Sequence, residues 1–114
     1  MDNYIWITAQ KEMLHHYPGA PDEVDYLKYL HRHIFHFKVY IEVFHDNRDV
    51  EFIMFKHKVE EYLEHVKQKL LKKSCEMMSD YLHDLLLQDY PGRKMMISVS
   101  EDKENGSFKT YDKT

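Results

Sequence analysis

The sequence predicts an α+β fold in which two helices lie between two β-hairpins, and two observations carry this prediction. Apolar and polar residues alternate with the period of a β-strand in residues 31–44 and again in residues 95–100. Between these segments, apolar residues recur at steps of three and four, the period of an amphipathic helix. This ββααββ order indicates an antiparallel sheet with both helices packed on one face. The 114 residues provide for one domain, residues 1–114.

The first hairpin is predicted from composition and alternation. Residues 4–14 are rich in β-branched and aromatic side chains and predict the first strand. Residues 17–25 contain two prolines, which lack the amide hydrogen of a strand, and predict a connection. The alternating segment 31–44 predicts a long second strand, which ends at the turn-forming residues 46–49. A short strand is expected to follow at residues 50–55.

The helical region extends from Lys56 to Pro91-Gly92, where the helical spacing of apolar residues ends. Ser74 provides a helix cap part-way along, and two helices or one bent helix are equally compatible with the pattern. A hairpin formed by residues 95–100 and 107–111 is predicted to close the chain, with Asn105-Gly106 as its turn.

Composition excludes several classes of function. A net charge of −4 and an isoelectric point near 6.1 argue against a nucleic-acid-binding protein, which would concentrate lysine and arginine. Cys75 is the only cysteine, so an intrachain disulfide cannot form. No signal-peptide pattern is present, and no apolar run approaches the roughly 18 residues of a membrane span. We therefore expect a cytoplasmic protein that does not bind membranes.

Histidines are the main candidates for chemistry. His31 and His33 lie two residues apart on a predicted strand, so both point to the same face and could bind one metal ion. A third ligand would come from the end of the first strand, where His15 and His16 are adjacent and only one of them can point inward. Spacing alone is compatible with either a metal site or a solvated histidine cluster.

The order of these histidines resembles that of the 6-pyruvoyl- and 6-carboxy-tetrahydropterin synthase family. His16 is followed fifteen residues later by His31-Arg32-His33 and then by a long alternating strand, which is similar to the family's zinc-binding pattern. The resemblance implies the tunnelling fold (T-fold) and a Zn²⁺ ion bound by His16, His31 and His33. It also implies a homo-oligomer, a hexamer or related ring, whose strands close into a barrel.

Two later segments extend the resemblance. Ser74-Cys75-Glu76 is similar to the start of the family's second helix. Val99-Ser100-Glu101 is similar to a late strand whose glutamate holds the pyrimidine edge of the pterin. The resemblance therefore implies that Glu101 binds the ligand, since a carboxylate can accept two parallel hydrogen bonds from such an edge. A polar strand end leading into the turn is the other interpretation of this residue.

The sequence also departs from the family pattern at the residues that catalyse its reaction. Leu27 and Lys28 occupy the neighbourhood of the usual cysteine, and Cys75 is a poor substitute at the start of a helix. The Asp-His pair between the two helices is missing. His57, His65 and His83 could replace it, but we expect their helical positions to be solvated. No catalytic residue is assigned.

Three functions are compatible with these observations. The first is a zinc protein that binds a pterin-, purine- or nucleotide-like ligand without the family's reaction, which the missing cysteine favours. The second is a zinc-dependent lyase that acts on dihydroneopterin triphosphate or a similar pterin, which the retained histidines favour. The third is a metal-free interaction module that assembles through its sheet edges.

Overall fold

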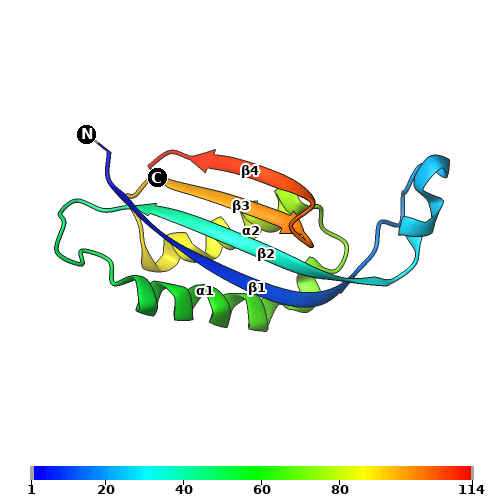
Figure 1. Cartoon of the computed structure of the whole chain (residues 1–114), viewed down its shortest axis with the longest axis horizontal. Coiled ribbons are helices and arrows are strands. Elements are labelled where there is room, and N and C mark those ends of the chain that lie inside the picture. Colours follow the sequence, from blue (N-terminus) through cyan, green and yellow to red (C-terminus); the bar gives the residue numbers. More distant parts are fainter. Residues whose placement is uncertain (1, 114) are drawn as a thin grey trace.

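The computed structural model describes residues 2–113. Four strands form one antiparallel sheet in the order β1-β2-β3-β4, and both α-helices cover the same face (Figure 1). The predicted α+β class with an antiparallel sheet is confirmed. The elements are β1 (Tyr4–His15), the 3-10 segment η1 (Asp22–Lys28), β2 (His31–Glu42), α1 (Phe52–Val66), the 3-10 segment η2 (Lys67–Leu70), α2 (Cys75–Asp89), β3 (Met95–Glu101) and β4 (Asn105–Tyr111).

The core lies between the sheet and the two α-helices. Alternate residues of β2 point towards the helices and are almost completely buried: Phe35, Phe37, Val39 and Ile41. Helix residues at three- and four-residue steps form the other side of the core: Phe55, Val59, Leu63, Met78, Leu82 and Leu86. The strand and helix periods of the sequence therefore identify the buried faces correctly.

The hairpin of β1 and β2 is longer than the rest of the sheet. β1 pairs with β2 from Tyr4 opposite Glu42 to His15 opposite His31, whereas β3 pairs with β2 only over residues 35–41. The far end of the hairpin therefore extends past β3, and η1 lies at its tip (Figure 1). The molecule is elongated as a result, with extents of 50 × 24 × 23 Å.

The short strand expected at residues 50–55 is wrong, because α1 begins there. The Glu51 carboxylate accepts a hydrogen bond from the backbone N–H of Met54 at 2.8 Å and caps the helix. Of the apolar run that follows, only Phe55 is buried, so these side chains occupy a helical turn at the surface. The helix cap at Glu51 and the burial of Phe55 favour a helix here more strongly than the β-rich composition favours a strand.

The turn predicted at Asn105-Gly106 is also displaced. Both residues belong to β4, and the chain reverses at Asp102 and Lys103, whose φ angles are 54° and 63°. Gly106 has a different role, because a Cβ atom there would overlap the carbonyl oxygen of Val99 on the paired strand. The glycine permits a close approach between β3 and β4.

The helical region consists of two helices rather than one bent helix. η2 separates α1 from α2, and the Ser74 hydroxyl accepts a hydrogen bond from the Met77 N–H at 3.2 Å, as its predicted capping role requires. The predicted connection between β1 and β2 contains η1. Within residues 2–113, neither helix combines the length and apolar character that crossing a membrane requires.

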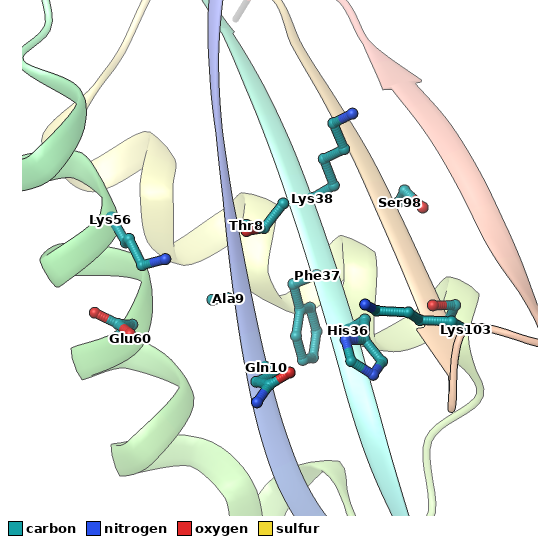
Figure 2. A pocket seen from close by; sticks show the side chains of 11 residues that line it. Thr8, Ala9, Gln10, His36, Phe37, Lys38, Lys56, Glu60, Ser98 and Lys103 are labelled. Carbon is teal, nitrogen blue, oxygen red and sulfur yellow. The ribbon is translucent and has the colours of Figure 1, made fainter.

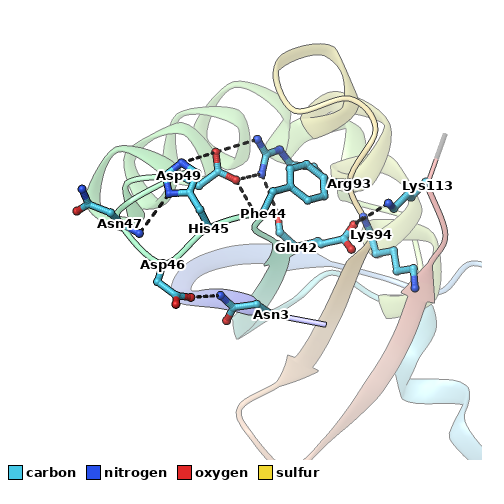
Figure 3. Close-up of polar contacts among 10 residues, drawn as sticks. All are labelled: Asn3, Glu42, Phe44, His45, Asp46, Asn47, Asp49, Arg93, Lys94 and Lys113. Carbon is cyan, nitrogen blue, oxygen red and sulfur yellow. Dashed lines mark hydrogen bonds and ion pairs between the residues drawn. The ribbon is translucent and has the colours of Figure 1, made fainter. Parts of the chain in front are cut away.

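Polar contacts fix the end of the sheet opposite the hairpin tip (Figure 3). Asp49 accepts hydrogen bonds at 2.8 Å from Arg93 Nη1 and from the backbone N–H of Phe44. Arg93 also donates to the Glu42 carbonyl oxygen at 3.0 Å. The Arg93 hydrogen bond, followed by that from Phe44, lowers the pKa of Asp49 from its ordinary 3.8 to about 2. This ion pair ties the loop after β2 to the connection between α2 and β3.

Candidate functional site

Three imidazoles lie together on the helix-facing side of the sheet. His15 and His31 are directly opposite each other in the register of β1 and β2, and His33 follows two residues along the same face. The ring centroids are 5.5 Å apart for His15 and His31, and 4.6 Å apart for His31 and His33. We call these three residues the histidine cluster.

An oxygen atom contacts one ring nitrogen of each imidazole in the cluster. His15 Nε2 lies 2.7 Å from the carbonyl oxygen of Lys73, and His31 Nδ1 lies 2.8 Å from that of Tyr29. His33 Nδ1 lies 2.7 Å from Oδ2 of Asp102. A carbonyl or carboxylate oxygen can only accept, so each of these ring nitrogens carries the hydrogen.

These hydrogen bonds fix which ring nitrogen would carry the lone pair when the imidazole is neutral. These nitrogens are Nδ1 of His15, Nε2 of His31 and Nε2 of His33. Those of His15 and His33 are buried and have no hydrogen-bond partner among residues 2–113. A buried ring nitrogen without a partner is unfavourable unless water or an ion completes the site.

The cluster is not a preformed metal site. Within residues 2–113, no group of three His, Cys, Asp or Glu side chains could hold a metal ion in its present arrangement. The three rings are close, but they meet edge to face, at interplanar angles of 87° and 83°. Binding one ion through all three free nitrogens would require the side chains to rotate.

His16 lies beside the cluster rather than in it. β1 ends at His15, and the His16 backbone N–H donates to the carbonyl oxygen of Leu71 at 3.1 Å. Its ring nitrogen Nδ1 lies 3.3 Å from the carbonyl oxygen of Lys28. Of the two adjacent histidines, His15 is therefore the one that the structure brings together with His31 and His33.

A cavity of about 520 Å³ opens next to the cluster. Its walls come from the end of β1, the start of α2 and the hairpin of β3 and β4. They include His15, His16, His31, Cys75 and Glu101. The cavity thus contains the predicted ligand residue and two of the three predicted metal ligands, while His33 lies outside its lining. This volume is in the range of small-molecule sites.

Two adjacent carboxylates lie at the end of β3: Glu101, its last residue, lines this cavity, and Asp102 follows it. Oε2 of Glu101 lies 3.7 Å from Nε2 of His33. Asp102 contacts the same ring from its other side, and its Oδ1 accepts the backbone N–H of Ile34 at 2.9 Å. The Ile34 N–H first, and His33 second, lower the pKa of Asp102.

Comparison with known proteins does not name a family. No protein-family model matches this chain, and no curated protein matches its sequence. The geometry of the site is therefore the basis for a functional proposal.

Cys75 lines the cavity but is a weak nucleophile. The side chain is buried at the first residue of α2, and burial, with the nearby Glu101 and Glu76 carboxylates, raises the pKa of its thiol to about 11. At neutral pH the sulfur is protonated, whereas a catalytic cysteine acts as the thiolate. Cys75 therefore does not supply a thiolate to the cavity.

The expectation that all three helical histidines are solvated is wrong for His83. His57 and His65 are exposed, but His83 is buried and its ring stacks on Tyr111, with centroids 3.9 Å apart. Desolvation lowers the pKa of His83, so the ring is neutral at physiological pH. The residue lies under β4, outside the lining of the cavity, and is part of the packing.

Sequence reasoning missed Asp102. It directly follows the predicted ligand residue, and it adopts the left-handed conformation at the start of the turn. Its role depends on the pairing of β2 with β3, which places residues 33 and 102 in contact. The sequence signal that could have identified Asp102 is a carboxylate next to the candidate ligand residue Glu101.

Proposed function

We propose that this chain is a divergent protein of the tetrahydropterin-synthase type, with the tunnelling fold. It binds Zn²⁺ through His31, His33 and a histidine at the end of β1. In the adjacent cavity it holds a pterin-, purine- or nucleotide-like ligand. The observation that carries the proposal is that all three cluster imidazoles direct their hydrogens to oxygen acceptors and keep their second nitrogen free.

The donor set fits zinc. Three imidazole nitrogens with one open position form a common catalytic zinc site, and metal-bound histidines usually donate their other ring N–H to a carbonyl or carboxylate. We assign His15 as the third ligand because its free Nδ1 is buried without a partner. His16 is the alternative, because it also lines the cavity.

Glu101 is the proposed anchor for the organic ligand. Its side chain is 27% exposed, and it lines the same cavity as His15 and His31. A carboxylate in this position can accept hydrogen bonds from the amino and ring N–H groups of a pterin or purine. The neighbouring zinc would supply a Lewis acid that polarises a hydroxyl or carbonyl group of the ligand.

Ligand binding without the usual lyase reaction is the function that the site supports best. The high pKa of Cys75 deprives the cavity of a thiolate. His83, the buried histidine of α2, stacks on Tyr111 and is unavailable for proton transfer at the cavity. The cluster itself favours the lyase as the second candidate, because zinc chemistry does not require a cysteine.

A ring of several copies is part of the proposal. Within residues 2–113, β1 and β4 form the two edges of the sheet, where backbone groups could pair with another copy. A shallow groove beside the β1 edge is lined in part by Phe52 and Ile53 of α1. Both side chains are at least half exposed, so a second copy packed on this side of α1 would bury them.

Metal content is the first test of the proposal. We expect about one zinc per chain in the wild-type protein, as in single-ion sites of this type, and loss of zinc in the His31→Ala/His33→Ala variant. His15→Ala should also lose zinc, whereas His16→Ala and the exposed control His57→Ala should retain it. Elemental analysis after dialysis measures each, and circular dichroism establishes folding. A wild-type protein without zinc would instead favour the interaction module.

Ligand binding is the second test. Titration of zinc-loaded protein with neopterin and guanosine should give saturable binding that Glu101→Ala abolishes while zinc content stays unchanged. Glu104→Ala, an exposed carboxylate in the same turn, is the matched control. Turnover of dihydroneopterin triphosphate that depends on His31 and His33 would establish the lyase instead. Unchanged affinity in Glu101→Ala would remove this residue from the site.

A further inference from the structure

A second cavity is lined mainly by residues on the face of the sheet that points away from the helices, together with Lys56 and Glu60 of α1. Its volume is about 590 Å³, and it extends from α1 across β1 and β2 to the turn between β3 and β4 (Figure 2). We call it the outer trough. Its floor and rim include Thr8, Gln10, His36, Lys38, Ser98 and Lys103. Neighbouring residues of a strand point to opposite faces, so the sheet separates the outer trough from the histidine cluster.

Unpaired positive charge gathers in the outer trough. Lys38, Lys56 and Lys103 all line it, and within residues 2–113 none of them forms an ion pair with a carboxylate. Most other lysines and arginines of the described chain do form such pairs. Glu60 is the one carboxylate among the lining residues. Lysines therefore outnumber carboxylates in the outer trough, although the whole protein carries a net charge of −4.

The positive groups come from different elements along the lining of the outer trough. Lys38 is on β2, and Lys56 lies on α1 at the opposite side of β1 (Figure 2). Lys103 reaches from the turn over the sheet beside His36. Ser98 and Gln10 add a hydroxyl and an amide as hydrogen-bond donors. Ammonium groups and neutral donors around one cavity form a suitable environment for phosphate oxygens.

Aromatic side chains lie directly beside this positive region. The Lys38 ammonium group is 4.2 Å from the ring centroid of Trp6 and 5.2 Å from that of Tyr40. Phe108 packs edge to face against Tyr40 at 6.5 Å. Trp6 and Phe108 remain 54% and 59% exposed, so the row has free surface on which a flat ring could stack. Lys38 connects the aromatic row with the cationic region.

We propose that the outer trough binds a nucleotide. The phosphates lie against Lys38, Lys103 and His36, and the base lies against the aromatic row of Trp6, Tyr40 and Phe108. A cavity of about 590 Å³ suits one small molecule. A long polyanion would meet the negative charge of the rest of the protein. The site is separate from the cavity at Glu101 and does not depend on zinc.

Trp6 provides a direct readout, because it is the only tryptophan in the chain. We expect ATP to bind saturably and to change Trp6 fluorescence. Inorganic tripolyphosphate should bind with a smaller change in fluorescence, and adenosine should bind more weakly than ATP. The Lys38→Gln/Lys103→Gln variant should lose at least about tenfold in ATP affinity, because two charge-assisted contacts are removed. Isothermal titration calorimetry gives the affinities.

Two control variants distinguish binding in the outer trough from general attraction to lysines and from binding at Glu101. Lys28→Gln/Lys69→Gln removes two exposed lysines outside the outer trough and should leave ATP affinity unchanged. Glu101→Ala should also leave it unchanged. The proposal is overturned if ATP does not bind or if the two lysine variants weaken it equally. It is also overturned if Glu101→Ala alone abolishes binding, or if a single-stranded oligonucleotide binds far more tightly than ATP through Lys38 and Lys103.

Discussion

Asp102 holds two partners in place at the candidate site. One of its oxygens accepts the Ile34 N–H, and the other accepts the Nδ1 hydrogen of His33. The carboxylate therefore sets both the tautomer and the orientation of the ring, and it leaves Nε2 facing away with its lone pair. A group of this kind affects metal binding without touching the metal.

The Asp102→Asn substitution tests this positioning role. We expect zinc affinity to fall by about 10- to 100-fold, the usual effect of removing a carboxylate behind a metal-bound histidine. The variant should still fold, because the Asn amide oxygen can accept the Ile34 N–H. Competition with a chromogenic chelator measures the dissociation constant. Glu104→Gln is the control, and equal affinity in the Asp102 variant and wild type would contradict the role.

Gly106 is a position where the absence of a side chain matters for two strands. We expect Gly106→Ala to destabilise the protein by about 1–3 kcal/mol, because the added methyl group would overlap the backbone of β3 and force the strands apart. Gly19→Ala is the control, since its Cβ would meet only the Tyr17 ring, at 3.6 Å. Urea unfolding measures both, and equal stabilities would show that β4 adjusts freely.

At the scale of elements, the ion pair of Asp49 and Arg93 joins the loop before α1 to the connection between α2 and β3. The folded state lowers the pKa of Asp49 from 3.8 to about 2, so folding favours the ionised carboxylate. The resulting stability is fully present above about pH 4. This stability is lost as the pH falls towards 2, because Asp49 is then protonated in the folded protein as well as in the unfolded one.

The Asp49→Asn variant isolates this contribution. Above about pH 4 the variant should have a lower unfolding midpoint in urea than wild type, because Arg93 then lacks its carboxylate partner and keeps only the Glu42 carbonyl oxygen. The difference between the two proteins should shrink between about pH 4 and pH 2. A constant difference across this range would show that Asp49 stabilises the loop through its shape rather than its charge.

Periodic elements could be predicted from the sequence, whereas their ends could not. The alternation in β2 and the spacing in α1 follow directly from burial of one face. Residues 50–55 were misassigned because β-rich composition does not report a cap such as Glu51. His83 was misassigned because its burial depends on Tyr111, which comes from a distant strand.

The candidate site could likewise be predicted from the sequence only in part. His31 and His33 could be predicted to share a face from their spacing alone. The choice between His15 and His16 required the register, in which residue 15 lies opposite residue 31. Asp102 and the outer trough required the pairing of β2 with β3, which local sequence patterns do not specify.

At the scale of the whole molecule, the proposed ring depends on the exposed apolar groove beside β1. We expect Ile53→Lys to shift the protein towards a monomer at micromolar concentration, because a charge would enter the buried contact. Light scattering coupled to size exclusion measures the mass. Met54→Lys, which adds the same charge at a neighbouring exposed residue outside the groove, should leave the mass unchanged. Equal masses for wild type and both variants would exclude this contact.

The histidine cluster brings together parts of the chain that are far apart in sequence. His15 contacts the carbonyl group of Lys73 across 58 residues, and His33 contacts Asp102 across 69 residues. The β1–β2 hairpin can form locally, but these contacts require the chain to close long loops, which is a slow event in folding. A metal that binds only once these loops have closed would stabilise the native protein, and we expect its removal to shorten the native lifetime.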